Sequence, residues 1–349
     1  LDPVPKDAGL AGARLGIADN ASTGGFLGHN YSLEVAEVEL GADPMPVVEQ
    51  ALADGFRLFV IDAPAEALAP IVAAVGAAGG LGFNATAPDM TLRNAACHPA
   101  LLHTGLSRQM KTDALAQFLL TRRWSDVAMI VGPNDGDAAW ADAFRASARK
   151  FGLDIVGERG WDFDADMRRN AATEVPVFTQ ELGDYDALVV ADEADDFARY
   201  IPFNTWDARP VVGHAGLRAE GWDRVVEQWG AAQLQSRFDD LAGRPMRSDD
   251  YGAWAAVRAI GEAVTRTNSG EAADLRAFLL GDGFTLAAFK GRPLSFRGWN
   301  GQLRQPVPLV HPRALAALAP LEGFLHETNP LDSLGLDQGD SACTAFGEN

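Results

Sequence analysis

The chain has 349 residues, of which 47% are hydrophobic and 22% charged, and its formal net charge is −19. This length allows two domains of ordinary size. The negative charge argues against nucleic-acid partners and anionic membrane surfaces, because both repel an acidic protein. No uninterrupted apolar run approaches the roughly 20 residues of a membrane-spanning helix.

The first hundred residues predict an alternation of strands and helices. Strands are expected at residues 14–18, 35–40, 58–61 and 81–83, and helices at residues 44–53 and 65–77. This β-α-β order predicts a parallel sheet with helices on both faces.

The alternation then starts again. Helices are expected at residues 112–121, 138–151, in a segment ending near 182, and at 193–200, and strands at residues 127–131, 155–158, 187–190 and 210–213. Helices at 251–264 and 271–280 precede two β runs, 293–297 and 303–310. Asn300-Gly301 between these runs predicts a tight hairpin.

Two doubly wound α/β lobes with a ligand cleft between them are the expected fold. The first lobe is assigned residues 1–107 and 245–285, and the second residues 108–244 and 286–312. Residues 313–349 contain prolines and glycines with weak periodicity, so they are expected to form a tail that straps the surface and is dispensable after about Pro320.

Cys97 and Cys343 are the two cysteines of the chain, and neither lies in a C-x-x-C motif. They are expected to form a disulfide in an oxidising compartment, whereas in the cytosol they would be unrelated thiols. The sequence begins at Leu1 without Met, which we interpret as a secreted protein whose signal peptide was removed, although a trimmed polypeptide would look the same.

Enzyme motifs are missing from the sequence. There is no phosphate loop, no H-E-x-x-H and no G-x-S-x-G. Gly24-Gly25-Phe26-Leu27-Gly28 lacks dinucleotide-binding spacing, and the six histidines lack ligand spacing. We therefore expect no catalytic residues and no cofactor. An enzyme on a two-lobed α/β scaffold and a ligand-sensing regulatory domain remain as alternatives.

Polar residues at predicted strand ends are the candidate ligand-binding set, because doubly wound sheets bind ligands beyond the carboxyl ends of their strands. The set is Asp19, Asp62, Asn84, Thr86, Asp135, Asp137, Asp192, Glu193 and His214. No Lys or Arg stands among them, so a cationic ligand is favoured. The metal-ion candidates are Asp19, Asp62, Asp135, Asp192 and Glu193. The alternative is that these residues stabilise turns and helix starts.

Three segments resemble periplasmic binding proteins of the branched-chain amino acid type. Residues 82–92 (GFNATAPDMTL) resemble the family's early loop, which grips the ligand carboxylate, and residues 249–264 and 294–310 resemble its late helix and hairpin. The similarity spans residues 13–312. The resemblance implies a type I binding-protein fold and a periplasmic solute-binding protein of an ABC importer. It also implies a monomer whose partner is an inner-membrane permease.

The tail, residues 324–343, resembles the subfamily associated with PQQ-dependent alcohol dehydrogenase systems. Two departures argue against a standard α-amino acid ligand: His214-Ala215-Gly216 stands where the family has an acidic residue, and Asp135-Gly136-Asp137 where it often has an aromatic one. A lanthanide or other hard metal ion, or a polyamine, is favoured. An amino-acid-like or alcohol-derived solute is the alternative. PQQ itself is a polyanion and would need Arg side chains.

Overall fold

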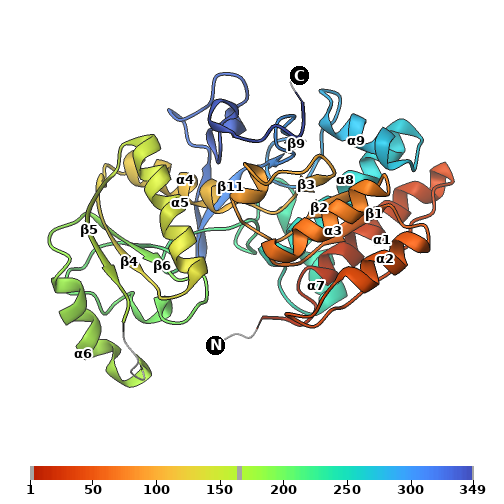
Figure 1. Ribbon diagram of the computed structural model, residues 1–349. Coiled ribbons are helices and arrows are strands. Elements are labelled where there is room, and N and C mark those ends of the chain that lie inside the picture. Colours follow the sequence, from red (N-terminus) through yellow and green to blue (C-terminus); the bar gives the residue numbers. More distant parts are fainter. Residues whose placement is uncertain (1–3, 163–166, 348–349) are drawn as a thin grey trace. The chain divides into compact units, whose positions relative to one another are not determined.

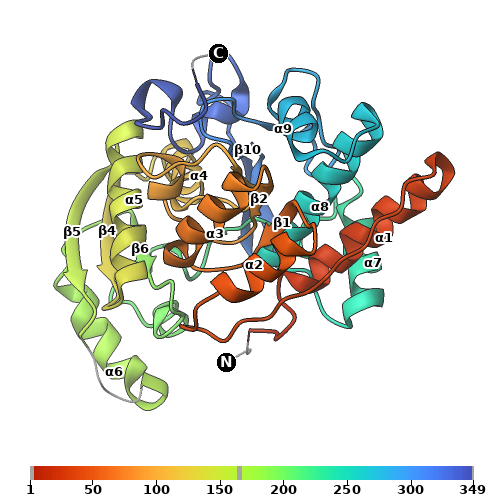
Figure 2. The same ribbon diagram turned by 45° about the vertical axis from the view of Figure 1, so that its right-hand side comes forward.

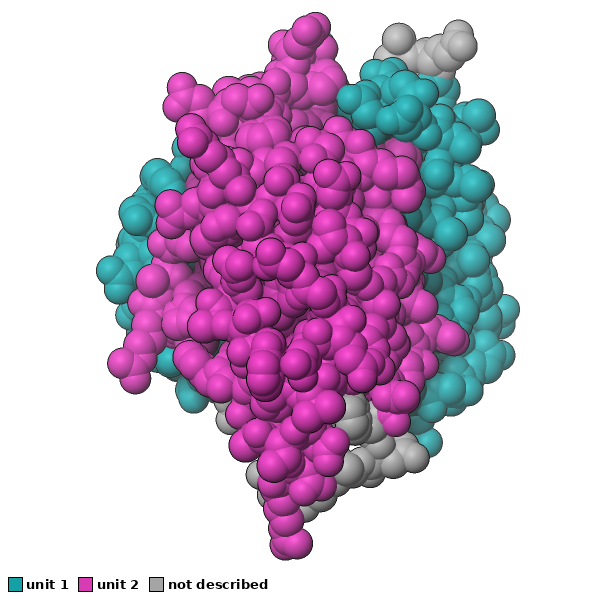
Figure 3. Space-filling view, turned by 90° about the vertical axis from the view of Figure 1, so that its left-hand side faces the viewer, with its two compact units in different colours: residues 1–107, 221–306, 337–349 teal, residues 108–220, 307–336 magenta. Residues whose placement is uncertain are grey.

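The structure is a computed structural model that describes residues 4–162 and 167–347 and divides into two units. Unit 1 comprises residues 1–107, 221–306 and 337–349, and unit 2 comprises residues 108–220 and 307–336 (Figure 3). The first point at which the chain passes from unit 1 to unit 2 coincides with the expected boundary between residues 107 and 108. The chain returns to unit 1 at residue 221, not at 245 as expected, because α7 (Ala231–Ala242) packs on α1. It leaves unit 1 after residue 306, not after 285, because β9 (Ser295–Phe296) packs on α9.

The central sheet of unit 1 is parallel and has the order β1 (Leu58–Ile61), β2 (Leu81–Asn84), β3 (Leu101–His103) (Figure 1). The predictions for β1 and β2 are confirmed, and β3 was missed. Helices α2 (Met45–Ala53) and α3 (Ala65–Ala77) pack on one face and were both predicted (Figure 2). Four residues of α3 share the helical spacing of a buried stripe: Leu68, Ile71, Val72 and Val75.

Helix α1 (Leu10–Leu27) occupies residues that were predicted to include a strand at 14–18, so that prediction is wrong. The helix packs closely on α8 (Ser248–Thr267). A Cβ on Gly12 would lie 1.8 Å from the Asp250 carbonyl oxygen, and one on Gly16 would lie 2.8 Å from Val257 Cβ. Glycines four residues apart therefore let two helix backbones approach, a role that a short apolar run does not reveal.

The strand predicted at residues 35–40 is also not observed. Among the described residues no strand pairs with this segment, and Val35, Val38 and Leu40 are 46%, 38% and 94% exposed. The alternating pattern satisfies the sequence rule for a strand, but the prediction is wrong, because a strand also needs a neighbour to pair with.

The C-terminal part of unit 1 follows the predictions more closely. Helices α8 and α9 (Ala272–Leu280) are confirmed, and β9 and β10 (Leu303–Arg304) form the predicted hairpin. The turn is wider than expected, because the Arg297 amide donates to the Gln302 carbonyl at 2.9 Å, which leaves residues 298–301 to make the turn.

Unit 2 is built on a parallel sheet of order β5 (Asp154–Gly160), β4 (Asp126–Val131), β6 (Ala187–Ala191), β7 (Val211–Gly213), and all four strands were predicted. Helix α6 (Met167–Gln180) covers one face; α5 (Asp135–Phe151), with α4 (Arg108–Thr121) packed beside it, covers the other. A second sheet is antiparallel and joins β12 (Ala314–Ala319), β11 (Val307–His311) and β8 (Arg218–Ala219).

The helix predicted at residues 193–200 is reduced to a 3₁₀ turn, η2 (Ala198–Tyr200), so this prediction is wrong. The Asp192 carboxylate accepts backbone N–H groups from Asp196, Phe197 and Ala198 at 2.7 to 2.9 Å. A side chain that satisfies three backbone donors competes with helix formation over the same residues.

Residues 313–336 do not strap the surface as expected. Residues 314–319 form strand β12, and the next part includes the 3₁₀ turn η3 (Pro330–Ser333), where Leu331 is 4% exposed; Leu334 just after it is fully buried. The segment belongs to unit 2, where its backbone forms hydrogen bonds with side chains of α4 and α5. The Gly335 amide donates to Asp113 of α4, and the Ser333 carbonyl accepts from Lys150 of α5.

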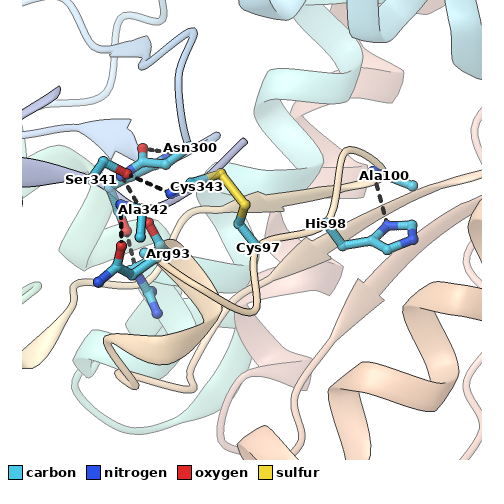
Figure 4. Close-up of a disulfide and its surroundings, with 10 residues drawn as sticks. Arg93, Cys97, His98, Ala100, Asn300, Ser341, Ala342 and Cys343 are labelled. Carbon is cyan, nitrogen blue, oxygen red and sulfur yellow. Dashed lines mark hydrogen bonds between the residues drawn. A yellow bond between two sulfur atoms is a disulfide. The ribbon is translucent and has the colours of Figure 1, made fainter. Parts of the chain in front are cut away.

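Residues 337–347, with the 3₁₀ turn η4 (Gln338–Asp340), return to unit 1, where the predicted disulfide between Cys97 and Cys343 is confirmed (Figure 4). The Ala342 amide donates to Asn94 Oδ1 at 2.6 Å, so the backbone beside the disulfide is also anchored. No helix in the described ranges is long and apolar enough to cross a membrane.

Candidate functional site

The sheet edge of unit 1 brings together three of the predicted residues: Asp62 after β1, and Asn84 and Thr86 at the end of β2. The Thr86 hydroxyl donates to Asp62 Oδ1 at 2.7 Å. Buried Asn84 holds its own loop, since Asn84 Oδ1 accepts the amides of Thr86 and Ala87 at 3.2 and 2.9 Å. Of the three, Asp62 and Thr86 therefore have accessible side chains at this edge, while buried Asn84 fixes the loop.

Arg93 also holds the loop after β2 in place and was missed by the sequence analysis. Its guanidinium is 1% exposed and donates to the carbonyls of Ala87 and Asp89 at 2.9 and 3.0 Å and to Gln302 Oε1 at 2.5 Å. A buried Arg that spans a loop and the distant hairpin makes the loop rigid. Its sequence signal was weak, because the partner Gln302 lies far away along the chain.

In unit 2 the predicted acids largely stabilise backbone. Asp137 is fully buried and accepts the Asn134 amide at 3.1 Å and the Glu193 amide at 2.6 Å, and Asn134 with Asp137 forms a capping box on α5. Asp192 is 1% exposed and engaged by three amides of its own loop. These two acids have the cap and turn role that was the alternative interpretation.

Glu193 forms a bidentate ion pair with Arg108, with Nε and Nη2 of the arginine at 2.9 and 2.8 Å from the two carboxylate oxygens. The side chains are 24% and 10% exposed. The expectation that no basic residue stands among the strand-end acids is therefore wrong. Arg108 opens α4, where the helix dipole disfavours a positive charge, and this is a signal that could have identified a partnered arginine.

His214 lies at the end of β7 in contact with Trp140, at a ring-centroid distance of 4.9 Å. The Asp192 amide donates to His214 Nδ1 at 3.0 Å, and the Val190 carbonyl oxygen lies 3.2 Å from the same nitrogen. Burial lowers the pKa of His214, and the nearby Lys111 charge lowers it further. Trp140, which sequence reasoning missed, is 2% exposed and packs between His214 and Phe144.

Asp19 is not at a strand end. It lies in α1, forms an ion pair with Arg237, and accepts the Trp254 indole N–H at 2.9 Å. Asp135 is an exposed residue in the first turn of α5. Across the described residues no group of three His, Cys, Asp or Glu side chains lies close enough to hold a metal ion. The five metal candidates therefore do not form an oxygen cage among themselves.

Buried His103 and half-buried His214 predict a pH dependence of stability. Burial holds the pKa of His103, at the end of β3, well below its usual value, with a second contribution from Arg93, and burial also lowers the pKa of His214. The unfolded chain then binds protons that the folded chain does not, so stability is lost as the pH falls below about 6.5. We expect a loss of up to about 1.4 kcal/mol per pH unit for each residue.

Urea unfolding between pH 7.5 and 5.5 measures this effect. His103→Gln keeps a hydrogen-bond acceptor for Asn84 Nδ2 and should flatten the dependence. His311→Gln, at an exposed side chain of β11, is the matched control and should leave it unchanged. Equal slopes for both variants and the unmodified protein would contradict the prediction.

Comparison with known proteins gives matches in structure but not in sequence. No family model matches the chain, and no curated protein matches it. A branched-chain amino acid ABC transporter periplasmic ligand-binding protein from Burkholderia xenovorans superposes with a TM-score of 0.78 at 16% identity, over 99% of this chain and 97% of that chain.

Two ligand-bound structures are also similar. An ABC transporter substrate-binding protein from Desulfitobacterium hafniense in complex with Leu gives a TM-score of 0.71 at 17% identity, over 89% of this chain and 95% of that one. A solute-binding protein from R. palustris in complex with benzoate gives 0.69 at 12% identity, over 97% and 96%. The chain therefore has the α/β fold of the type I periplasmic binding proteins.

Proposed function

We propose that the chain is the periplasmic solute-binding component of an ABC importer and that it binds a small organic solute without changing it chemically. Its partner is a membrane permease, and it acts as a monomer. The observation that carries the proposal is the fold, which matches a periplasmic ligand-binding protein over 97% of that protein's length.

The state of the strand-end acids favours an organic solute over a hard cation. Of the five metal candidates, Asp19 and Glu193 are paired with arginines and Asp192 is occupied by backbone amides. A hard cation needs several free oxygen ligands. The accessible hydroxyl of Thr86 in unit 1 can instead hydrogen-bond to a polar group of an organic solute.

Native mass spectrometry of protein purified from its own compartment tests the proposal, because a slowly dissociating ligand survives purification. We expect an adduct of a small organic molecule. A ligand held by both units should also lower the radius of gyration in small-angle scattering. Chromatography must show the ligand unchanged after prolonged incubation, and steady conversion to a product would instead support the enzyme alternative.

A cationic ligand is the second candidate, since Asp62 and Asp135 are exposed. The variants Asp62→Asn and Asp135→Asn distinguish a cationic ligand from a neutral organic solute. Calorimetry with a trivalent lanthanide, calcium and a polyamine should show affinity falling by more than about tenfold in each variant if the ligand is cationic. For a neutral organic solute the loss should stay below about threefold. Asp239→Asn, at an exposed position on α7, is the control.

The association with PQQ-dependent alcohol oxidation stays a prediction from the resemblance of residues 324–343. An alcohol-derived solute found by mass spectrometry would support it, whereas an ordinary amino acid would not.

A further inference from the structure

A large groove in unit 1 runs along one edge of β1. It has a volume of about 2220 Å³ and is lined by β1, by residues 29–42, by α2 and α3, and by α8. Sites for small molecules measure roughly 300–1,000 Å³. The groove is therefore larger than the site of a small solute, and all its lining residues belong to unit 1.

The edge of β1 that faces the groove has unpaired backbone. The Arg57 carbonyl accepts the Leu81 amide at 2.7 Å, and the Ile61 carbonyl accepts the Ala85 amide at 3.0 Å. Odd-numbered residues of β1 thus face β2, so Leu58 and Val60 direct their N–H and C=O groups to the opposite edge. Among the strands of the described ranges none pairs with that edge. Backbone groups inside a protein are nearly always paired.

The two faces of β1 are covered like those of an interior strand. Phe59 and Ile61 pack into the cluster formed with α2 and α3, and Val60 packs into a cluster with residues of α1 and α8. Residues 58–61 read Leu-Phe-Val-Ile without a charge or a proline. Edge strands normally carry a charge or a proline that prevents further pairing, whereas continuous apolar strands lie inside parallel sheets.

The opposite wall of the groove, formed by residues 33–40, also has no strand paired with it among the described residues. Leu33 packs against the same cluster as Val60, and most of residues 33–40 line the groove opposite β1. This segment alternates like a strand but pairs with no strand of the described residues, and Val35 and Val38 are 46% and 38% exposed. A single additional strand would pair with both walls and cover these side chains.

We propose that one further β-strand, parallel to β1, fills this groove and is supplied by residues amino-terminal to Leu1 in a longer form of this polypeptide. Doubly wound sheets of the order 2-1-3-4-5 place their first strand between the second and third. Strands β1, β2 and β3 are parallel neighbours and correspond to positions three to five of this order. Residues 33–40, which line the groove without forming a strand, would then take position two. The vacant first position precedes α1, which then makes the crossover to residues 33–40.

Amide hydrogen exchange, resolved by residue with NMR, tests the proposal without any ligand. In residues 1–349 the amides of Leu58 and Val60 should exchange fast, while those of Phe59 and Ile61, which pair with β2, serve as protected controls. In the polypeptide extended to its natural amino terminus, Leu58 and Val60 should exchange at least about 100-fold more slowly. Equal exchange at these amides in both forms would overturn the proposal.

A second measurement covers the case in which the extended form does not fold. A synthetic peptide of the upstream residues, added to residues 1–349, should raise the melting temperature and protect the same two amides. Protection that rises with the concentration of residues 1–349 alone would show that a second copy fills the groove and would refute the proposed source. Amino-terminal sequencing that finds Leu1 as the first residue of the native protein would refute it as well.

Discussion

Truncation after Pro320 is expected to unfold unit 2, contrary to the expectation from sequence. Leu331 and Leu334 are buried, and losing each large apolar side chain costs about 2–5 kcal/mol. Buried Asp113 also loses the Gly335 amide, which it accepts at 2.7 Å, and Lys150 loses the carbonyls of Ser333 and Gly335. The sum is comparable with the whole stability of a domain, roughly 5–15 kcal/mol.

Far-ultraviolet circular dichroism and urea unfolding of the truncated chain measure this effect. Truncation after Leu336 in a Cys97→Ser background is the matched control, because it removes residues 337–349 but keeps the contacts to α4 and α5. The control should retain a cooperative transition of unit 2. A folded chain that ends at Pro320 would show that residues 321–336 are dispensable after all.

Loss of the disulfide is expected to have the second largest effect, and to act on unit 1. Cys97 and Cys343 are separated by 246 positions. Closing so long a loop removes conformational entropy from the unfolded chain, which stabilises the folded state by up to about 5 kcal/mol in the chain-entropy model. The double variant Cys97→Ser, Cys343→Ser should therefore unfold at a lower urea concentration than the oxidised protein.

The reduced unmodified protein is the control and should match the double variant, because both lack only the covalent link. The Ala342 amide bond to Asn94 is kept in both. Two free thiols in unreduced, denatured protein taken from its native compartment would contradict the disulfide itself.

The candidate site could be predicted in part from the sequence. Asp62 and Thr86 do follow strands β1 and β2 and contact each other, because the carboxyl ends of parallel strands carry loops whose polar residues meet at one edge. Their role in ligand binding stays a prediction. The sequence could not show that Glu193 pairs with Arg108 or that Asp19 pairs with Arg237, since 85 and 218 positions separate the partners. Charge balance at a site depends on such distant pairs, so the expectation of a free acidic cluster was wrong.

The sequence alone determined the α/β class, seven of the strand and helix positions in unit 2, and the pairing of the only two cysteines. These features depend on local periodicity and on composition, which a single segment carries. Tertiary structure decided the rest. Helix α1 forms because Gly12 and Gly16 fit against α8, residues 35–40 stay unpaired because no strand lies beside them, and the tail folds because Asp113 and Lys150 need its backbone. Each of these outcomes depends on residues far away in the chain, and the local sequence does not show which residues those are.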